Sequence, residues 1–420
     1  MKSEAIESRN GPLRGYRVLE LCSTIAGPVC ARLLADFGAE VIKIESPEGD
    51  PVRNMGYHEG DVSLYAASIL RNKETATVDL KTAAGRDLVC RLAAACDVVV
   101  ENFRPGTLER LGLGYDVLCT VNPGLVLARI SGYGQTGPYR VKPGYGVICE
   151  AFGGTRHLTG DPDRPPARVA VAVTDYLTAV YAAFGITMAL LERGRTGKGQ
   201  VVDTALYETA FSMMEAIVPA YDRLGLVPTR QGSRLPSMAP NNLYLAQDDV
   251  YVLIAANNNQ TFTRLAEAMG QPGLVDDPRF ASIRARSANV DAIDAIVAAW
   301  VRGLPGKEIE ERLEQASVPV SRVFTIADIY ADPHYRAREM LQQMPHPQLG
   351  QVTLAGVVPK LSETPGEIRH VGHDAGADTE AVLSRILHLA AEELRALEEV
   401  GAIRSAPRQP GAPREPGRAA

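Results

Sequence analysis

The chain has 420 residues, of which 45% are hydrophobic and 22% charged, and its formal net charge at pH 7 is −6. This length predicts two or three domains with ample material for a core, and the acidic balance disfavours nucleic acid as a partner. We find no secretory signal at the start and no uninterrupted apolar run of the roughly 18 residues that a membrane span needs. We therefore expect a cytoplasmic protein that does not contact a membrane.

The six cysteines all lie in the first 150 residues, and none forms a C-x-x-C pair. We interpret them as buried free thiols of a cytosolic protein. The seven histidines show no ligand spacing, so we predict no metal site.

Strand-like and helix-like segments alternate through the first half of the chain. We expect strands at 16–22 and 40–45, with a helix at 28–37 between them. Such a βαβ unit predicts a parallel sheet with right-handed crossovers. The same reading predicts further strands at 75–80, 97–103, 125–131 and 200–206, and helices at 83–95, at 175–193 and from about 207 to 220.

The pattern changes near Asp222. Residues 224–242 lack periodicity and are rich in Gly, Pro, Ser and Asn, which indicates a linker or a long functional loop. A smaller domain should follow, to about residue 325. Its predicted elements, and those of the rest of the chain, are a strand at 251–256, helices at 261–269, 290–301 and 326–340, a strand at 352–358, a helix at 379–400 and a disordered tail at 405–420.

Three loop motifs follow predicted strands. S-T-I-A-G-P at 23–28 enters a helix, where backbone N–H groups can face an anion, although an ordinary tight turn explains it equally well. E-N-F-R-P-G at 101–106, with Arg110, offers an amide, a ring and two arginines suited to a nucleotide with phosphates; a capped turn is the alternative. S-G-Y-G-Q-T-G-P at 131–138 permits close backbone approach to a ligand, or is simply a flexible turn.

Asp175 opens the long apolar helix predicted at 175–193. A carboxylate at this position caps the helix and is stabilised by the helix dipole. The same environment keeps the carboxylate ionised and available as a nucleophile. The two interpretations are compatible.

Ten short segments, each present once, follow one another along the chain. They are R-V-L-E-L at 17–21, A-G-P at 26–28, G-A-E-V-I-K-I-E at 38–45, G-D-P-V-R at 49–53, N-K at 72–73, V-D-L-K at 78–81, E-N-F-R-P-G at 101–106, G-Y-G-Q-T-G-P at 132–138, T-D at 174–175 and G-K-G-Q-V-V-D at 197–203. Together they resemble the family III CoA-transferases, of the L-carnitine dehydratase/bile acid-inducible protein superfamily, which include formyl-CoA transferase and succinyl-CoA:glutarate CoA-transferase.

The resemblance implies an α/β fold with a Rossmann-like parallel-sheet large domain, a smaller α+β middle domain and an interlocked homodimer. On this basis we assign residues 1–222 to the N-terminal part of the large CoA-binding domain. Residues 223–325 are then the small domain with its linker, and residues 326–404 return to the large domain.

The resemblance also implies the chemistry. The family nucleophile matches Asp175, which would form an aspartyl anhydride and then an aspartyl–CoA thioester. Coenzyme A is implied as a substrate, with no tightly bound cofactor. The implied CoA contacts are Ile25, Ala26, Val78, Asp79, Leu80, Lys81, Asn102, Phe103, Arg104, Arg110 and Tyr145.

The chain departs from formyl-CoA transferase at Ser46 and Pro143, where that enzyme has Arg and Lys, and it lacks the glycine-rich loop of the small domain. Segments 232–236 and 239–242 resemble instead the branch that uses larger, often dicarboxylic, acids. We expect succinyl-CoA as donor and malate, citramalate, itaconate, mesaconate or glutarate as acceptor. Candidates for holding the distal carboxylate are Arg53, Arg234 and residues 257–260.

Two alternatives remain. An α-methylacyl-CoA racemase shares the fold and the aspartate, but it needs a second acid–base group, a histidine where this chain has Tyr145. A phenol with a pKa of about 10 is a poor substitute. The other alternative is a non-catalytic CoA-binding homologue, against which the presence of Asp175 argues.

Overall fold

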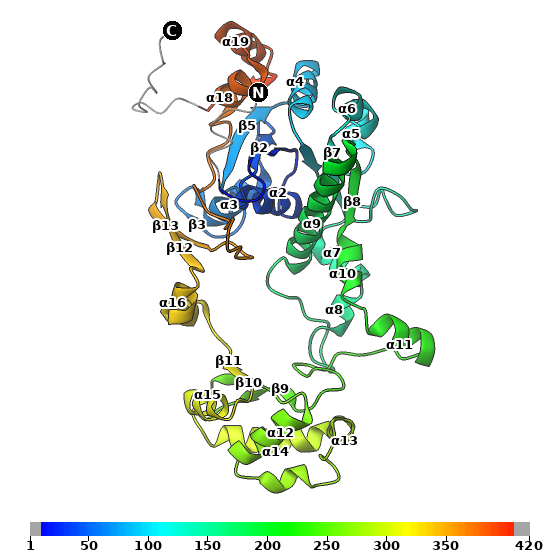
Figure 1. The fold of residues 1–420 in the computed structure, drawn as a ribbon, viewed down its shortest axis with the longest axis vertical. Coiled ribbons are helices and arrows are strands. Elements are labelled where there is room, and N and C mark those ends of the chain that lie inside the picture. The colour runs from blue at the N-terminus through cyan, green and yellow to red at the C-terminus, as the bar shows by residue number, and fades with distance from the viewer. Residues whose placement is uncertain (1–9, 407–420) are drawn as a thin grey trace. The chain divides into compact units, whose positions relative to one another are not determined.

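The computed structural model describes residues 10–406, and they form two compact units (Figure 1). The first unit contains the chain up to Gly153, Ala170–Glu215 and the part from Ala337 on. The second contains Gly154–Val169 and Ala216–Arg336. The sequence-based boundaries at 222 and 325 did not separate Gly154–Val169, which belongs to the second unit.

The first unit is built on a seven-stranded sheet of order β14-β5-β2-β1-β6-β7-β8. All strands except β14 (Ile403–Arg404) run parallel, which confirms the predicted parallel α/β sheet. The parallel strands are β1 (Arg17–Glu20), β2 (Glu40–Glu45), β5 (Lys73–Val78), β6 (Val98–Glu101), β7 (Val126–Ser131) and β8 (Val201–Ala205).

The order of the strands reverses between β1 and β6. From β1 the chain moves outward through β2 to β5, and from β6 it moves the other way through β7 to β8. The loops that leave β1 and β6 therefore diverge at neighbouring strand ends. In open α/β sheets this switch point is where ligands bind.

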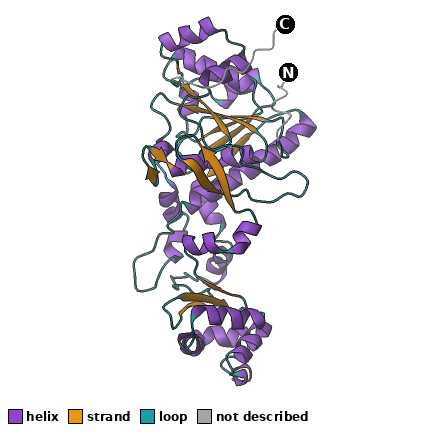
Figure 2. Cartoon of the chain, turned by 90° about the vertical axis from the view of Figure 1, so that its left-hand side faces the viewer, coloured by secondary structure: helices purple, strands orange, loops and turns teal. Residues whose placement is uncertain are grey.

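Helices cover both faces of the sheet (Figure 2), because a parallel sheet must be buried on both sides. One core contains residues of α2 (Ala26–Asp36) and α9 (Val173–Thr196). The other contains residues of α4 (Ala83–Ala94), α18 (Thr379–Leu387) and α19 (Ala391–Glu399). All six cysteines are free, and four of them are buried.

Helix α9 has the length and hydropathy of a membrane span. It nevertheless connects two parallel strands, β7 and β8, and packs Ala179, Ala182, Ile186 and Ala189 into the core beside the sheet. We interpret it as a core helix.

Shorter elements complete the first unit. They are η1 (Pro51–Asn54), β3 (His58–Glu59), β4 (Val62–Ser63), α3 (Leu64–Ile69), α5 (Thr107–Arg110), α6 (Tyr115–Val121), α7 (Gly146–Phe152), α10 (Leu206–Ser212), β12 (Leu341–His346) and β13 (Gly350–Ala355).

The second unit surrounds an antiparallel sheet of order β11-β10-β9 with a separate core that includes Phe262 and Phe280. Its strands are β9 (Asn241–Leu245), β10 (Tyr251–Ala255) and β11 (Val320–Arg322). Its helices are α8 (Thr155–Leu158), α11 (Ile217–Leu224), α12 (Asn259–Ala268), η2 (Pro272–Val275), α13 (Ile283–Ala288), α14 (Val290–Arg302), α15 (Gly306–Gln315) and α16 (Ile326–Ala331), with α17 (Pro333–Ala337) at its boundary.

Three predicted helices prove to be broken. The one at 379–400 divides into α18 and α19 because His388 takes a left-handed φ of 57°. The one at 326–340 divides into α16 and α17 at Asp332, since a residue before proline disfavours the helical region. The helix predicted from about 207 to 220 is α10 and α11. Of the predicted tail, residues 407–420 lie outside the described residues, whereas the Ala406 backbone N–H donates to the Gly376 carbonyl.

Candidate active site

A hollow of about 220 Å³ lies beyond the carboxyl ends of β1, β6 and β7. We call it the Asp175 hollow. Residues from six separate stretches of the chain line it, among them Thr24, Ile25, Ala26, Asn102, Phe103, Arg104, Gly132, Tyr145 and Asp175. The structure thus places Asp175 beside the loops that the sequence assigned to coenzyme A.

A second hollow, of about 490 Å³, adjoins the first and shares Ser23 and Phe103 with it. Among its lining residues are Val78, Asp79, Leu80 and Lys81. The two hollows therefore lie next to each other at the strand ends, and we call them together the groove. Arg110 lines neither hollow; it is exposed at the end of α5, where its Nη2 donates to Thr107 Oγ1 at 2.8 Å.

Asp175 lies in the first turn of α9, where the helix dipole favours negative charge. Its carboxylate packs against Gly146, so closely that a Cβ there would lie 2.0 Å from Oδ2. Only glycine permits this contact, a constraint that the sequence did not reveal. Cys149 lies one turn after Gly146 in α7 and is buried. Its pKa is raised to about 11, mainly by burial and to a smaller extent by the charge of Asp175.

Tyr65, on α3, is a neighbour of Asp175 that the sequence analysis missed. Its pKa is raised by burial, by a hydrogen bond with Tyr176 and by the charge of Asp175. The hydroxyls of Tyr65 and Tyr176 are 3.5 Å apart. A single tyrosine in a short helix carries no sequence signal that would have identified it.

Buried charges support the loop that follows β1. Lys43 Nζ donates to Glu20 Oε1 at 2.9 Å and to the Cys22 carbonyl at 2.8 Å. Lys73 Nζ lies 2.8 Å from Glu20 Oε2 and donates to the Pro28 carbonyl at 2.6 Å. The three charged side chains are wholly buried. Two lysines therefore hold the two ends of the loop through one shared carboxylate.

Asp50 and Asn102 hold the middle of the same loop. Asp50 Oδ1 accepts from the Thr24 backbone N–H at 3.0 Å, and its Oδ2 lies 2.7 Å from Lys43 Nζ. Asn102 accepts from the Ser23 N–H at 3.0 Å and donates to the Ser23 carbonyl at 2.8 Å. Thr24 has a φ of 72°, which β-branched residues rarely adopt, so these contacts hold a strained wall of the Asp175 hollow.

The glycine-rich loop after β7 forms the opposite wall. A Cβ on Gly132 would lie 3.0 Å from Gly144 Cα, so the two ends of the loop touch through their backbones. The Gln135 N–H donates to Asp203 Oδ2 at 2.9 Å. Aromatic rings support this loop with centroid separations of 5.3 to 6.2 Å, namely Tyr133, Tyr139, Phe152 and Tyr207.

The residues predicted to hold a distal carboxylate already have partners in the structure. Arg53 Nε donates to Glu45 Oε2 at 2.8 Å. In the second unit, Arg234 pairs with Asp294 at 2.7 Å and with Asp291 at 2.8 Å. Asn257, Asn258 and Asn259 accept hydrogen bonds from Asn241, Thr261 and Arg286. These contacts assign them to the fold.

Among residues 10–406, no histidine lines the Asp175 hollow, and no group of three or more His, Cys, Asp and Glu side chains is arranged for a metal ion. A racemase needs a basic group opposite the aspartate. Tyr145, which takes the place of that histidine, lines the hollow with 72% of its surface exposed.

A doubly wound sheet with a carboxylate in a hollow at its switch point is typical of a Rossmann-like enzyme. The profile of "CoA-transferase family III" matches residues 13–379. The chain therefore belongs to this family and is a CoA-transferase that acts on CoA thioesters.

Relatives and solved structures agree with this placement. The chain is 44% identical to succinyl-CoA–D-citramalate CoA-transferase of Chloroflexus aurantiacus, over 92% of this chain and 97% of that protein. It is 38% identical to the alpha subunit of succinyl-CoA–L-malate CoA-transferase of Chloroflexus aurantiacus, over 92% and 91% of the two chains. A CaiB/BaiF family protein from Brucella suis matches with a TM-score of 0.80 and 34% identity, over 90% of this chain and all of that one.

Proposed function

We propose that this chain transfers coenzyme A from succinyl-CoA to a second carboxylic acid, itself a dicarboxylic acid, with Asp175 as the nucleophile. The observation that carries the proposal is the position of Asp175 in a hollow that six of the predicted CoA contacts also line, namely Ile25, Ala26, Asn102, Phe103, Arg104 and Tyr145. The two Chloroflexus aurantiacus relatives support the choice of donor and of a four- or five-carbon diacid as acceptor.

The reaction proceeds by four exchanges of acyl groups. The Asp175 carboxylate attacks the thioester carbonyl, so that a C–O bond forms, the C–S bond breaks and CoA thiolate leaves an acyl–aspartyl anhydride. The thiolate then attacks the aspartyl carbonyl, which releases the donor acid and leaves an aspartyl–CoA thioester. The acceptor carboxylate and the thiolate repeat these steps in the opposite order and regenerate Asp175.

Anionic nucleophiles and anionic leaving groups suffice for every step, so none requires proton transfer. A carboxylate without a basic partner is therefore adequate, whereas a serine would need a base and would form an unactivated ester. The tetrahedral intermediates need N–H donors, a role that we assign to the backbone of one of the glycine-rich loops. The close Gly146–Asp175 contact fixes the carboxylate beside the loop after β7.

Trapping of the acylated side chain tests this mechanism. Protein incubated with succinyl-CoA and then with hydroxylamine should carry a hydroxamate at Asp175, which peptide mass spectrometry locates. Asp175→Asn, which preserves the shape of the side chain, should lower kcat about 10⁴-fold or more with CoA binding retained. Asp87→Asn, at an exposed ion pair on α4, is the matched control. Transfer at the normal rate by the Asp175→Asn protein would refute the mechanism.

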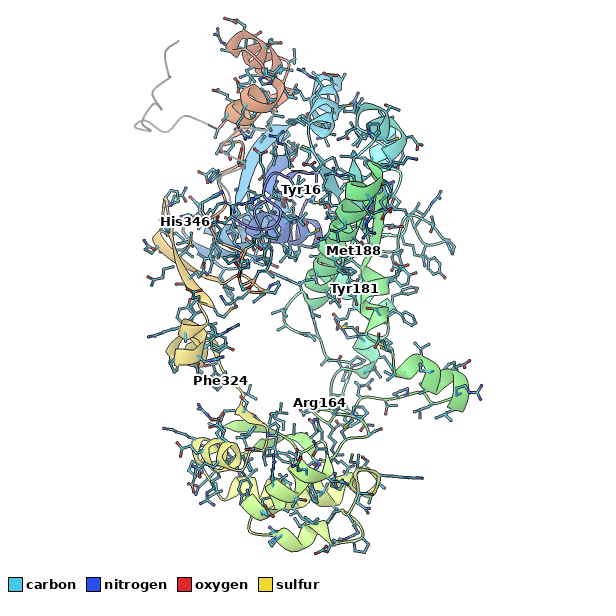
Figure 3. The ribbon with its side chains drawn as sticks, viewed as in Figure 1. Tyr16, Arg164, Tyr181, Met188, Phe324 and His346 are labelled. Carbon is cyan, nitrogen blue, oxygen red and sulfur yellow. The ribbon has the colours of Figure 1, made fainter. Side chains whose placement is uncertain are left out.

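We also propose a homodimer in which a second copy covers the outer face of α9. Large apolar side chains form a row along this face, each 43% to 60% exposed, and Tyr181 and Met188 belong to it (Figure 3). The row is Val180, Tyr181, Phe184, Met188 and Leu191. Contiguous apolar surface of this kind marks an interface.

Sedimentation velocity gives the test of the dimer. The native protein should sediment as a dimer, and Phe184→Glu should shift it to the monomer because it places a charge on the covered face. Val117→Glu, at an exposed apolar position on α6 away from α9, is the matched control. A native protein that sediments as a monomer at micromolar concentration would contradict the proposal.

A further inference from the structure

Arg32, on helix α2, is a partly buried arginine whose charge is poorly compensated. Its side chain is 14% exposed, and its Nη1 reaches a carboxylate, Asp36 Oδ2, only at 3.5 Å. Within the described part of the chain, its buried Nε has no hydrogen-bond partner. A buried donor left in this state destabilises the fold unless something else satisfies it.

The carboxylate of Asp36 is already taken by other donors. Arg71 donates to its two oxygens at 3.1 and 2.8 Å, and Asn72 Nδ2 donates at 2.8 Å. The buried Arg71 and the partly buried Arg32 therefore share one carboxylate. Burial is the main cause that lowers the pKa of Arg32, and the charge of Arg71 lowers it further. The site carries an excess of positive charge that a bound anion would balance.

Two phenols connect this arginine with the nucleophile. Tyr176 and Tyr65 act to raise the pKa of Arg32, and their hydroxyls lie 3.5 Å apart. Tyr65 also senses the charge of Asp175, and Tyr176 directly follows Asp175 at the start of α9. Helix α2 packs along α9 beside them. Arg32, the two hydroxyls and Asp175 thus occupy one region at the start of α9.

We propose that Arg32 binds the distal carboxylate of the dicarboxylic acyl group while that group is attached to Asp175, with the hydroxyls of Tyr65 and Tyr176 beside it. This inference rests on the proposed function and names the residue that selects diacids. Acylation removes the negative charge of Asp175, and the distal carboxylate restores one next to the uncompensated arginine. Guanidinium groups bind carboxylates by two parallel N–H···O bonds, and the unused Nε supplies one of these donors.

Selectivity between succinyl-CoA and butyryl-CoA measures this contact, because the two acyl groups have the same length and differ in the distal carboxylate. Arg32→Met should lower kcat/KM for succinyl-CoA about 10- to 100-fold, the effect of losing a charged hydrogen bond. It should change kcat/KM for butyryl-CoA less than about threefold. Arg32→Lys keeps the positive charge but loses the two parallel N–H donors of the guanidinium group. Its kcat/KM for succinyl-CoA should lie between those of the native protein and Arg32→Met.

Arg53→Lys is the matched control, since Arg53 is the rival candidate on the same unit and is paired with Glu45. It should leave the succinyl/butyryl preference unchanged. An unchanged preference in folded Arg32→Lys and Arg32→Met proteins would overturn the inference, as would an equal loss with both substrates. If Arg32→Met does not fold, Arg32→Lys decides the question alone.

Calorimetric binding of free succinate and butyrate separates this inference from the proposed mechanism, because binding needs no turnover. Native protein should bind succinate more tightly than butyrate, and Arg32→Met should remove the difference. Preferential binding of succinate that depends on Arg32, in a protein that cannot be trapped at Asp175, would uphold the diacid site and refute the nucleophile. Equal binding of both acids by the native protein would refute the site.

Discussion

Two regions of the first unit differ in how their charges are balanced. The Asp175 hollow has a volume of about 220 Å³, whereas a cavity of about 680 Å³ lies beside α3 and the β12–β13 hairpin and is lined by Arg53, His370 and His373. We call the second one the histidine cavity. It is larger and richer in ionisable groups, yet Asp175 and the predicted CoA contacts lie outside it.

The partners of these groups explain the difference. In the histidine cavity, Arg53 pairs with Glu45, and His373 Nδ1 lies 2.8 Å from Asp378 Oδ2. Arg32, which lines neither cavity, by contrast shares a carboxylate that is already taken by Arg71. Charges that are balanced within the chain stabilise the fold, whereas the unbalanced charge that we propose to bind the acyl group is available for a ligand.

The largest effect should come from breaking a balanced set of charges, the Glu20 network. Glu20→Gln leaves the ammonium groups of Lys43 and Lys73 buried without their shared carboxylate. Loss of one partner from a buried ion pair costs about 3–5 kcal/mol, so the free energy of unfolding in urea should fall by that amount. The loop of residues 22–28 should also loosen and raise KM for acyl-CoA.

Glu48→Gln is the matched control, since Glu48 is exposed and lies 4.0 Å from Lys81. We expect no resolvable change in its unfolding free energy, because exposed ion pairs contribute little. Equal urea midpoints for Glu20→Gln and the native protein would show that the buried charges are not a stabilising network. The comparison between balanced and unbalanced charges would then fail.

The sequence predicts the sheet and the position of the groove well. Strands such as Val98–Glu101 are short apolar runs that only a sheet buried on both faces explains. Parallel strands also bring their carboxyl ends together. The sequence placed each of the three loop motifs after a predicted strand, and the structure brings them together around one hollow.

The charge pairings behind the groove could not be predicted. Glu20 and Lys43 stand in strands where charged residues usually face water, and only the strand register shows that they meet in the interior. The incomplete pairing of Arg32 could not be predicted either, because Asp36 at i+4 suggests an ordinary helical ion pair. The competing bonds from Arg71 and Asn72 come from a distant segment. Such competition for one carboxylate is a property of the tertiary structure.

A smaller effect should arise in the histidine cavity and depend on pH. Burial, the charge of His373 and that of Arg369 lower the pKa of His370 to about 4, and its Nδ1 lies 2.7 Å from the Val371 carbonyl. In the unfolded chain this histidine titrates near pH 6.5. Its contribution to stability is therefore present above about pH 6.5 and is lost as the pH falls toward 4. The loss at pH 5 amounts to about 2 kcal/mol.

The neighbouring His373 responds in the opposite direction. Its hydrogen bond to Asp378 raises its pKa, so its contribution is complete below about pH 6.5 and is lost as the pH rises through the folded-state value. His370→Asn separates the two, since the amide can still donate to the Val371 carbonyl but does not titrate. Urea unfolding of this variant at pH 7.5 and pH 5 should show an acid loss about 2 kcal/mol smaller than that of the native protein.

His334→Asn, at an exposed histidine of the second unit, is the control and should leave the acid loss unchanged. The activity ratio between succinyl-CoA and butyryl-CoA should stay the same in both variants, because the histidine cavity has no part in binding the acyl group. A shift of that ratio in His370→Asn would make the larger cavity part of the reaction. Charge balance would then no longer distinguish the two regions, and the inference drawn from Arg32 would lose its physical basis.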